Sequence, residues 1–192
     1  MIERYEIDDF QRAFDVLQEG GLILYPTDTV WGIGCDASNE AAVAKLLALK
    51  NRSLGKPLTV LLDQIGKIPQ YVSEMPELAW DLIEVSEKPI TIVYGGGRLV
   101  AANVIADDGS IGIRVTDELF SQALCRRFRK PIVSSSANIC GGTTPKSFFE
   151  IDEAIVNGVD YVVKYRQDDR SLYTASSVLR LGLHGEIEII RG

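Results

Sequence analysis

Short, largely apolar runs recur along this chain, and each ends at a glycine, a proline or a polar residue. The clearest lie at 22–25, 58–62, 90–94 and 111–115. Runs of this length, rich in branched and aromatic residues, are typical of buried β-strands. None approaches the ~20 apolar residues that cross a bilayer, so we expect no membrane association.

Helical patterns alternate with these runs. Helices are expected over 41–49, begun by Ser38 or Asn39, over 76–85, and after Thr116, which has the side chain of an N-cap. Strands are also expected at 161–164, 177–181 and 186–190, the last two as a hairpin. This mixed order predicts an α/β (α+β) fold, a single domain over 1–192 with an open, twisted, mixed sheet flanked by helices.

The net charge and the small numbers of cysteine and histidine limit the functions that this protein can have. A net charge of −7 opposes non-specific attraction to nucleic acid, so RNA contact would need a local basic patch. The three cysteines form no CxxC pair and His184 is the one histidine, which argues against a disulfide framework and a zinc site. Free thiols and the lack of a signal-like N-terminus predict a cytoplasmic protein.

Three polar segments are candidates for a site. Thr27-Asp28-Thr29, followed by Gly32 and Gly34, offers hydroxyls beside flexible backbone, although an ordinary loop has the same composition. Lys50, Arg52 and Lys56 could bind phosphate, or the cations could simply offset a helix dipole. The run 134–144 directly follows a strand and is dense in hydroxyl, amide and N–H donors, which favours a site.

Two strand-end arginines, Arg114 and Arg191, complete the candidates. Each could clamp a carboxylate with two parallel hydrogen bonds, and a structural salt bridge is the alternative. Neither a GxxxxGK[ST] loop nor a dinucleotide fingerprint occurs in the sequence, which disfavours the common nucleotide folds.

Taken in order, these segments resemble the YrdC-like family, the threonylcarbamoyl-AMP synthases of tRNA modification. The resemblance rests on Tyr25–Thr29 with Gly32-x-Gly34, Lys50-x-Arg52 with Lys56-Pro57-Leu58, Ser110–Arg114, Ser136-Ala137-Asn138 and Arg191-Gly192. It implies an open α/β fold with a large concave cavity. The activity implied is a nucleotidyltransferase that makes threonylcarbamoyl-AMP and pyrophosphate from L-threonine, bicarbonate and ATP with Mg²⁺.

The same resemblance implies roles for individual residues. Lys50 and Arg52 would be catalytic. The nucleotide would be bound by Arg52, Lys56, Ser110, Ser136, Asn138, Thr144 and Arg191. L-Threonine would be bound by Thr29, Arg114, Ser134 and Ser176, and no protein metal ligand is implied.

The resemblance is to the short form of the family, which relies on separate tRNA-modifying partner proteins for the transfer step. Weak direct RNA binding stays open. Two alternatives remain beside the synthase: a related carbamoyl or adenylyl transferase with another substrate, and an RNA-binding or ribosome-associated module of the same fold.

Overall fold

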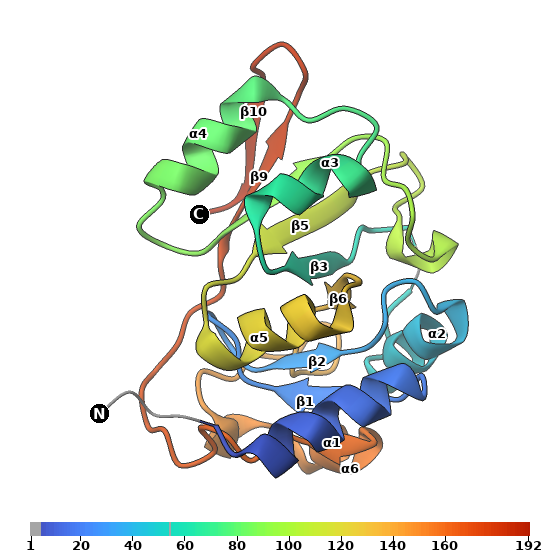
Figure 1. Ribbon diagram of the computed structural model, residues 1–192, viewed down its shortest axis with the longest axis vertical. Coiled ribbons are helices and arrows are strands. Elements are labelled where there is room, and N and C mark those ends of the chain that lie inside the picture. Colours follow the sequence, from blue (N-terminus) through green and yellow to red (C-terminus); the bar gives the residue numbers. More distant parts are fainter. Residues whose placement is uncertain (1–4, 54) are drawn as a thin grey trace.

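The computed structural model describes residues 5–53 and 55–192, and its strands form two mixed sheets (Figure 1). The smaller sheet has the order β7-β2-β1-β8 and the larger β10-β9-β4-β5-β3-β6. The smaller comprises β1 (Ile23–Tyr25), β2 (Gly32–Gly34), β7 (Ser135–Ser136) and β8 (Tyr161–Val162). The larger comprises β3 (Thr59–Leu62), β4 (Ile90–Tyr94), β5 (Ile111–Val115), β6 (Ile132–Val133), β9 (Ser177–Leu181) and β10 (Ile187–Arg191).

The expected mixed α/β fold is confirmed, but the strands are divided between two sheets. The division occurs at the serine run, residues 134–138. β6 pairs with β3 of the larger sheet, whereas β7, two residues further along, pairs with β2 of the smaller one. Ser134 lies at this crossover, and its N–H donates to the carbonyl of Thr59 at 2.8 Å. The serine run therefore ties the two sheets together.

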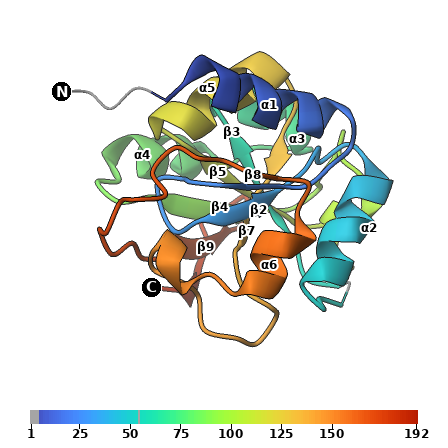
Figure 2. The same ribbon diagram turned by 90° about the horizontal axis from the view of Figure 1, so that it is seen from below.

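Helices cover the outer surfaces of both sheets. They are α1 (Ile7–Gln18), α2 (Glu40–Leu49), α3 (Ile68–Tyr71), α4 (Glu77–Val85), α5 (Leu119–Phe128) and α6 (Glu153–Gly158), with short 3₁₀ turns at 65–67, 102–104 and 148–150. Figure 2 shows α1 and α5 on one side of the strands and α6 on the opposite side. No helix in 5–53 or 55–192 is long and apolar enough to cross a membrane.

The helix starts test two of the expected caps. Asn39 caps α2, and its side-chain oxygen accepts from the N–H of Ala42 at 3.1 Å. The cap expected at Thr116 is wrong, because α5 begins later and Glu118 accepts from the N–H groups of Phe120 and Ser121. A carboxylate at this position satisfies two free N–H groups and favours the positive end of the helix dipole.

Two hydrophobic clusters hold the elements in place. The larger cluster includes Ile33 of the smaller sheet together with Val60, Ile92 and Ile113 of the larger sheet, each almost fully buried. The second packs α1 and α5 against both sheets around Phe120. Because apolar contacts join both sheets to the same cores, the space between the sheets has well-supported walls.

Candidate functional site

A cavity of about 310 Å³ opens between the two sheets, a volume within the range of ligand pockets. Its wall includes Gly32, Ser135 and Ser136 from the smaller sheet and faces β3, β4, β5, β9 and β10 of the larger one. Nine of the twelve residues expected in the site line it: Thr29, Arg52, Lys56, Arg114, Ser134, Ser136, Thr144, Ser176 and Arg191. Segments from both ends of the chain thus meet at one place.

The segment after β1 folds into a tight hydroxyl turn. The Thr27 hydroxyl donates to the carbonyl of Val30 at 2.9 Å, accepts from the N–H of Thr29 at 3.0 Å and lies 3.0 Å from the Thr29 hydroxyl. Such local bonds replace a strand continuation that Pro26 would disfavour. The turn brings Thr29 to the wall of the cavity.

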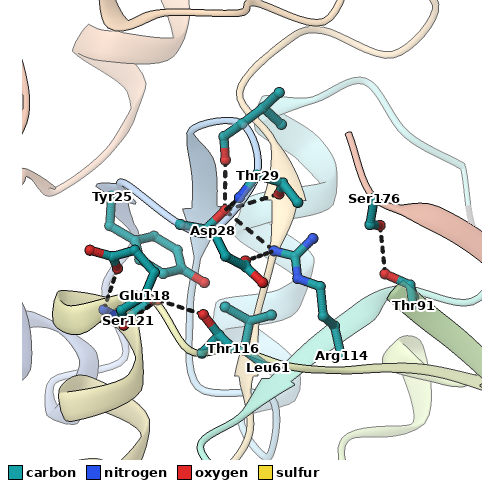
Figure 3. A network of polar contacts seen from close by, with 12 residues as sticks. Tyr25, Asp28, Thr29, Leu61, Thr91, Arg114, Thr116, Glu118, Ser121 and Ser176 are labelled. Carbon is teal, nitrogen blue, oxygen red and sulfur yellow. Dashed lines mark hydrogen bonds and ion pairs between the residues drawn. The ribbon is translucent and has the colours of Figure 1, made fainter. Parts of the chain in front are cut away.

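Arg114 on β5 faces this turn (Figure 3). Its Nη2 donates to the Thr27 hydroxyl at 3.3 Å and lies 3.2 Å from Oδ1 of Asp28, while its Nε is buried without a partner among the described residues. Burial raises the pKa of Asp28, and the Arg114 guanidinium opposes that rise. The guanidinium is therefore fixed from one side and keeps donor capacity for an oxyanion.

A second wall segment carries Arg52 and Lys56. Helix α2 ends at Leu49, and Asn51 then adopts a left-handed conformation with φ of 50° that turns the chain back. Nη2 of Arg52 donates to the carbonyl of Pro57 at 3.0 Å, which closes the loop onto the start of β3. The turn brings both cations to the cavity, and burial lowers the pKa of Arg52.

Lys50 lies beneath this wall. It is 3% exposed, does not line the cavity, and its Nζ donates to the carbonyls of Ser136 and Asn138, the latter at 2.6 Å. Burial, and then the charge of Arg52, lower the pKa of the Lys50 ammonium to about 8. The ammonium therefore joins the end of α2 to the serine run by bonds to backbone.

Two further expected residues also lie off the cavity wall. Ser110 is 1% exposed, and its hydroxyl donates to Oδ1 of Asp108 at 2.5 Å. The Asn138 amide donates to the carbonyls of Ile139 and Gly142, both at 2.9 Å. Both side chains are engaged by neighbouring loop atoms in this structure, so their expected contact with a nucleotide stays a prediction.

Three residues of the site were not expected from the sequence. Asp28 was noted only as part of a polar loop, yet it pairs with Arg114. Nη1 of Arg166 donates to the carbonyl of Thr27 at 3.2 Å and so supports the hydroxyl turn from behind. Arg180 lines the cavity from β9, and strand alternation could have found it, because it shares a face with Ser176 and Val178.

Comparison with known proteins places this chain in a family. The Sua5/YciO/YrdC family model, described as telomere recombination, matches residues 15–192. The chain belongs to the Sua5/YciO/YrdC family. The expected YrdC-like membership is thereby confirmed.

Relatives of this Sua5/YciO/YrdC protein carry informative names. A Pseudoalteromonas translucida protein called threonylcarbamoyl-AMP synthase is 34% identical over 155 residues, which are 79% of this chain and 82% of the relative. The P. abyssi Sua5 crystal structure, complexed with L-threonine, matches 93% of this chain at 25% identity with a TM-score of 0.83. This chain spans about half the length of that protein, 52%. E. coli YciO, at 20% identity and a TM-score of 0.81, shares the fold.

Proposed function

We propose that this protein is a threonylcarbamoyl-AMP synthase, which converts L-threonine, bicarbonate and ATP into threonylcarbamoyl-AMP, pyrophosphate and water. The curated relatives that carry this name support the proposal. The observation that carries it is the single cavity, which has Arg114 and Thr29 in its wall together with Arg52 and Lys56. One cavity could thus hold a small carboxylate beside a polyphosphate.

The roles follow from the chemistry of the wall. Arg114 would bind the threonine carboxylate through its unpartnered donors, with hydroxyls of Thr29, Ser134 and Ser176 nearby. Arg52 would neutralise phosphate charge. The remaining nucleotide contacts would come from Lys56, Ser136, Thr144 and Arg191.

We assign Lys50 a positioning role, because its ammonium is occupied by the carbonyls of Ser136 and Asn138. Its loss would move the serine run and only indirectly affect the phosphates. Asn138 would contribute through the same loop. Ser110 would act through the carboxylate of Asp108, which accepts its hydroxyl hydrogen bond.

The reaction needs positioning more than proton transfer. The threonine amine and bicarbonate form an N-carboxy anion with loss of water, and one of its oxygens attacks the α-phosphate in line as pyrophosphate leaves. Two anions must approach each other, so nearby cations and fixed geometry supply most of the stabilisation. Mg²⁺ would arrive with ATP, held by phosphate and water, since the described wall residues include no carboxylate.

Threonylcarbamoyl-AMP would pass to partner proteins that modify tRNA, and the protein would accordingly act in the cytoplasm. The test is pyrophosphate release by the purified protein with ATP, Mg²⁺ and bicarbonate. Release should require L-threonine. Release that ignores threonine and responds to another amine would favour a transferase with a different substrate, and salt-sensitive RNA binding without turnover would favour the RNA-binding module.

A further inference from the structure

Arg180 occupies a defined place on the inner face of the larger sheet. In the cross-strand register it pairs with Val93, Val93 pairs with Gly112, and Gly112 pairs with Thr59. All four residues line the cavity. Gly112 carries no side chain at the middle of this row. Arg180 on β9 and the segment that carries Arg52 and Lys56, which leads into β3, therefore lie at opposite ends of this row of strands.

Among the described residues, the guanidinium of Arg180 contacts only exposed carboxylates. Its Nη1 lies 2.8 Å from Oδ2 of Asp108 and its Nε lies 3.7 Å from Oε2 of Glu188, where the two carboxylate side chains are 51% and 70% exposed. Exposed pairs of this kind contribute little free energy. Nη2 has no partner within 5–53 and 55–192. Replacing these contacts with contacts to a more highly charged anion would therefore cost little free energy.

Arg180 also has space to move. Besides the cavity, it borders a second hollow of about 670 Å³ formed by the β9–β10 hairpin and the loop after β4, which includes Gly95, Gly182 and His184. Its side chain is 39% exposed. The guanidinium is not confined by packing on either side, so it can change rotamer without disturbing the core.

Asp108 is itself anchored. It accepts hydrogen bonds from the N–H and the hydroxyl of Ser110 at 3.0 and 2.5 Å. Hydrogen bonds from Ser110 and Arg180 lower the pKa of Asp108 to about 2, which favours the ionised carboxylate. Ser110 thus fixes Asp108, and Asp108 in turn holds Arg180 by a contact that can be exchanged.

We propose that Arg180 contacts the phosphates of bound ATP from the side opposite Arg52 and Lys56, and that Asp108 competes for it when the cavity is empty. The inference rests on the proposed function, since it requires ATP in this cavity. It makes Arg180 a nucleotide-binding residue and Asp108 a residue that sets nucleotide affinity.

The test is calorimetric titration of the intact protein with ATP, AMP and adenosine. Arg180→Ala should raise the Kd for ATP about 10-fold, the effect of one lost charged hydrogen bond, with a smaller effect for AMP and none for adenosine. Arg180→Lys keeps the charge and should recover most of the affinity. Arg126→Ala is the matched control: Arg126 is 69% exposed, pairs weakly with Asp63 at 3.8 Å and lies outside the cavity wall.

Asp108→Asn supplies a change in the opposite direction. Asparagine keeps an oxygen acceptor for Ser110 and removes the competing charge, so ATP should bind about 3-fold more tightly. This gain should vanish in the Arg180→Ala background, a coupling that a merely structural role would not produce.

The outcomes separate the two proposals. Wild-type protein that binds no ATP would overturn both. The inference alone would be overturned by the following combination of results. The wild-type protein binds ATP and releases pyrophosphate in response to threonine, and the Arg180→Ala variant binds ATP equally well. An equal loss of affinity for adenosine and ATP would also overturn it, because the contact would then not be to phosphate.

Discussion

Replacement of Lys50 by Met distinguishes support of the serine run from direct phosphate binding. Methionine keeps the length and apolar stem of the side chain and removes the ammonium. In the structure that ammonium donates to the carbonyls of Ser136 and Asn138 and is almost fully buried. The variant leaves both carbonyls without this donor, at the loop that joins the two sheets.

The expected cost follows from these contacts. Each hydrogen bond from a charged group contributes about 1.5–3 kcal/mol, and relief of the buried charge offsets part of the loss. We expect a net loss of about 3 kcal/mol in the free energy of unfolding. For a protein of this size, that corresponds to a fall in Tm of roughly 6–12 °C.

The assay is thermal and urea unfolding at pH 7, below the pKa of about 8 for the Lys50 ammonium, so that most wild-type molecules carry the charge. Lys45→Met, at an exposed position of α2, is the control and should leave Tm unchanged. A Lys50→Met protein with wild-type Tm and a selective loss of ATP affinity would refute the reasoning. The Lys50 ammonium would then bind the phosphates of ATP directly.

Three further substitutions test the cavity. Arg52→Ala should lower kcat/KM for ATP about 100-fold, and normal kinetics would contradict its assignment. Arg114→Ala should raise the KM for threonine by roughly 10-fold or more; a change confined to the KM for ATP would mean that the two subsites are exchanged. Gly34→Ala should lower stability by roughly 1–3 kcal/mol in urea unfolding, because the added Cβ would lie 2.6 Å from Cε1 of Tyr25 and 3.0 Å from the carbonyl oxygen of Val133; unchanged stability would show that Tyr25 and Val133 can shift to admit the methyl group.

The sequence was most informative where a strand is built from branched apolar residues. The strands expected at 90–94, 111–115 and 177–181 have the bounds found in the structure. β2 and β7 were not expected as strands, because Gly32–Gly34 and Ser135–Ser136 lack apolar alternation. They are strands through pairing with distant segments, which no local pattern encodes.

The candidate site shows the same contrast between local sequence patterns, which could be predicted, and contacts between distant segments, which could not. Polar residues at strand ends could be grouped from the sequence, because the ends of neighbouring strands meet. The contacts of Lys50 could not, since its acceptors are backbone carbonyls, and any residue type could supply those. Arg166 is similar, because it reaches the carbonyl of Thr27 from 139 positions away.

The wall of the cavity draws on Thr29 near the start of the chain and on Arg191 at the end of β10. During synthesis on the ribosome, the pocket therefore stays incomplete until β10 has emerged. A ligand of this pocket therefore cannot template folding before β10 is made. A fragment that ends before β10 would retain Arg52 and Arg114 but would lack Ile190 and Arg191 of the cavity wall.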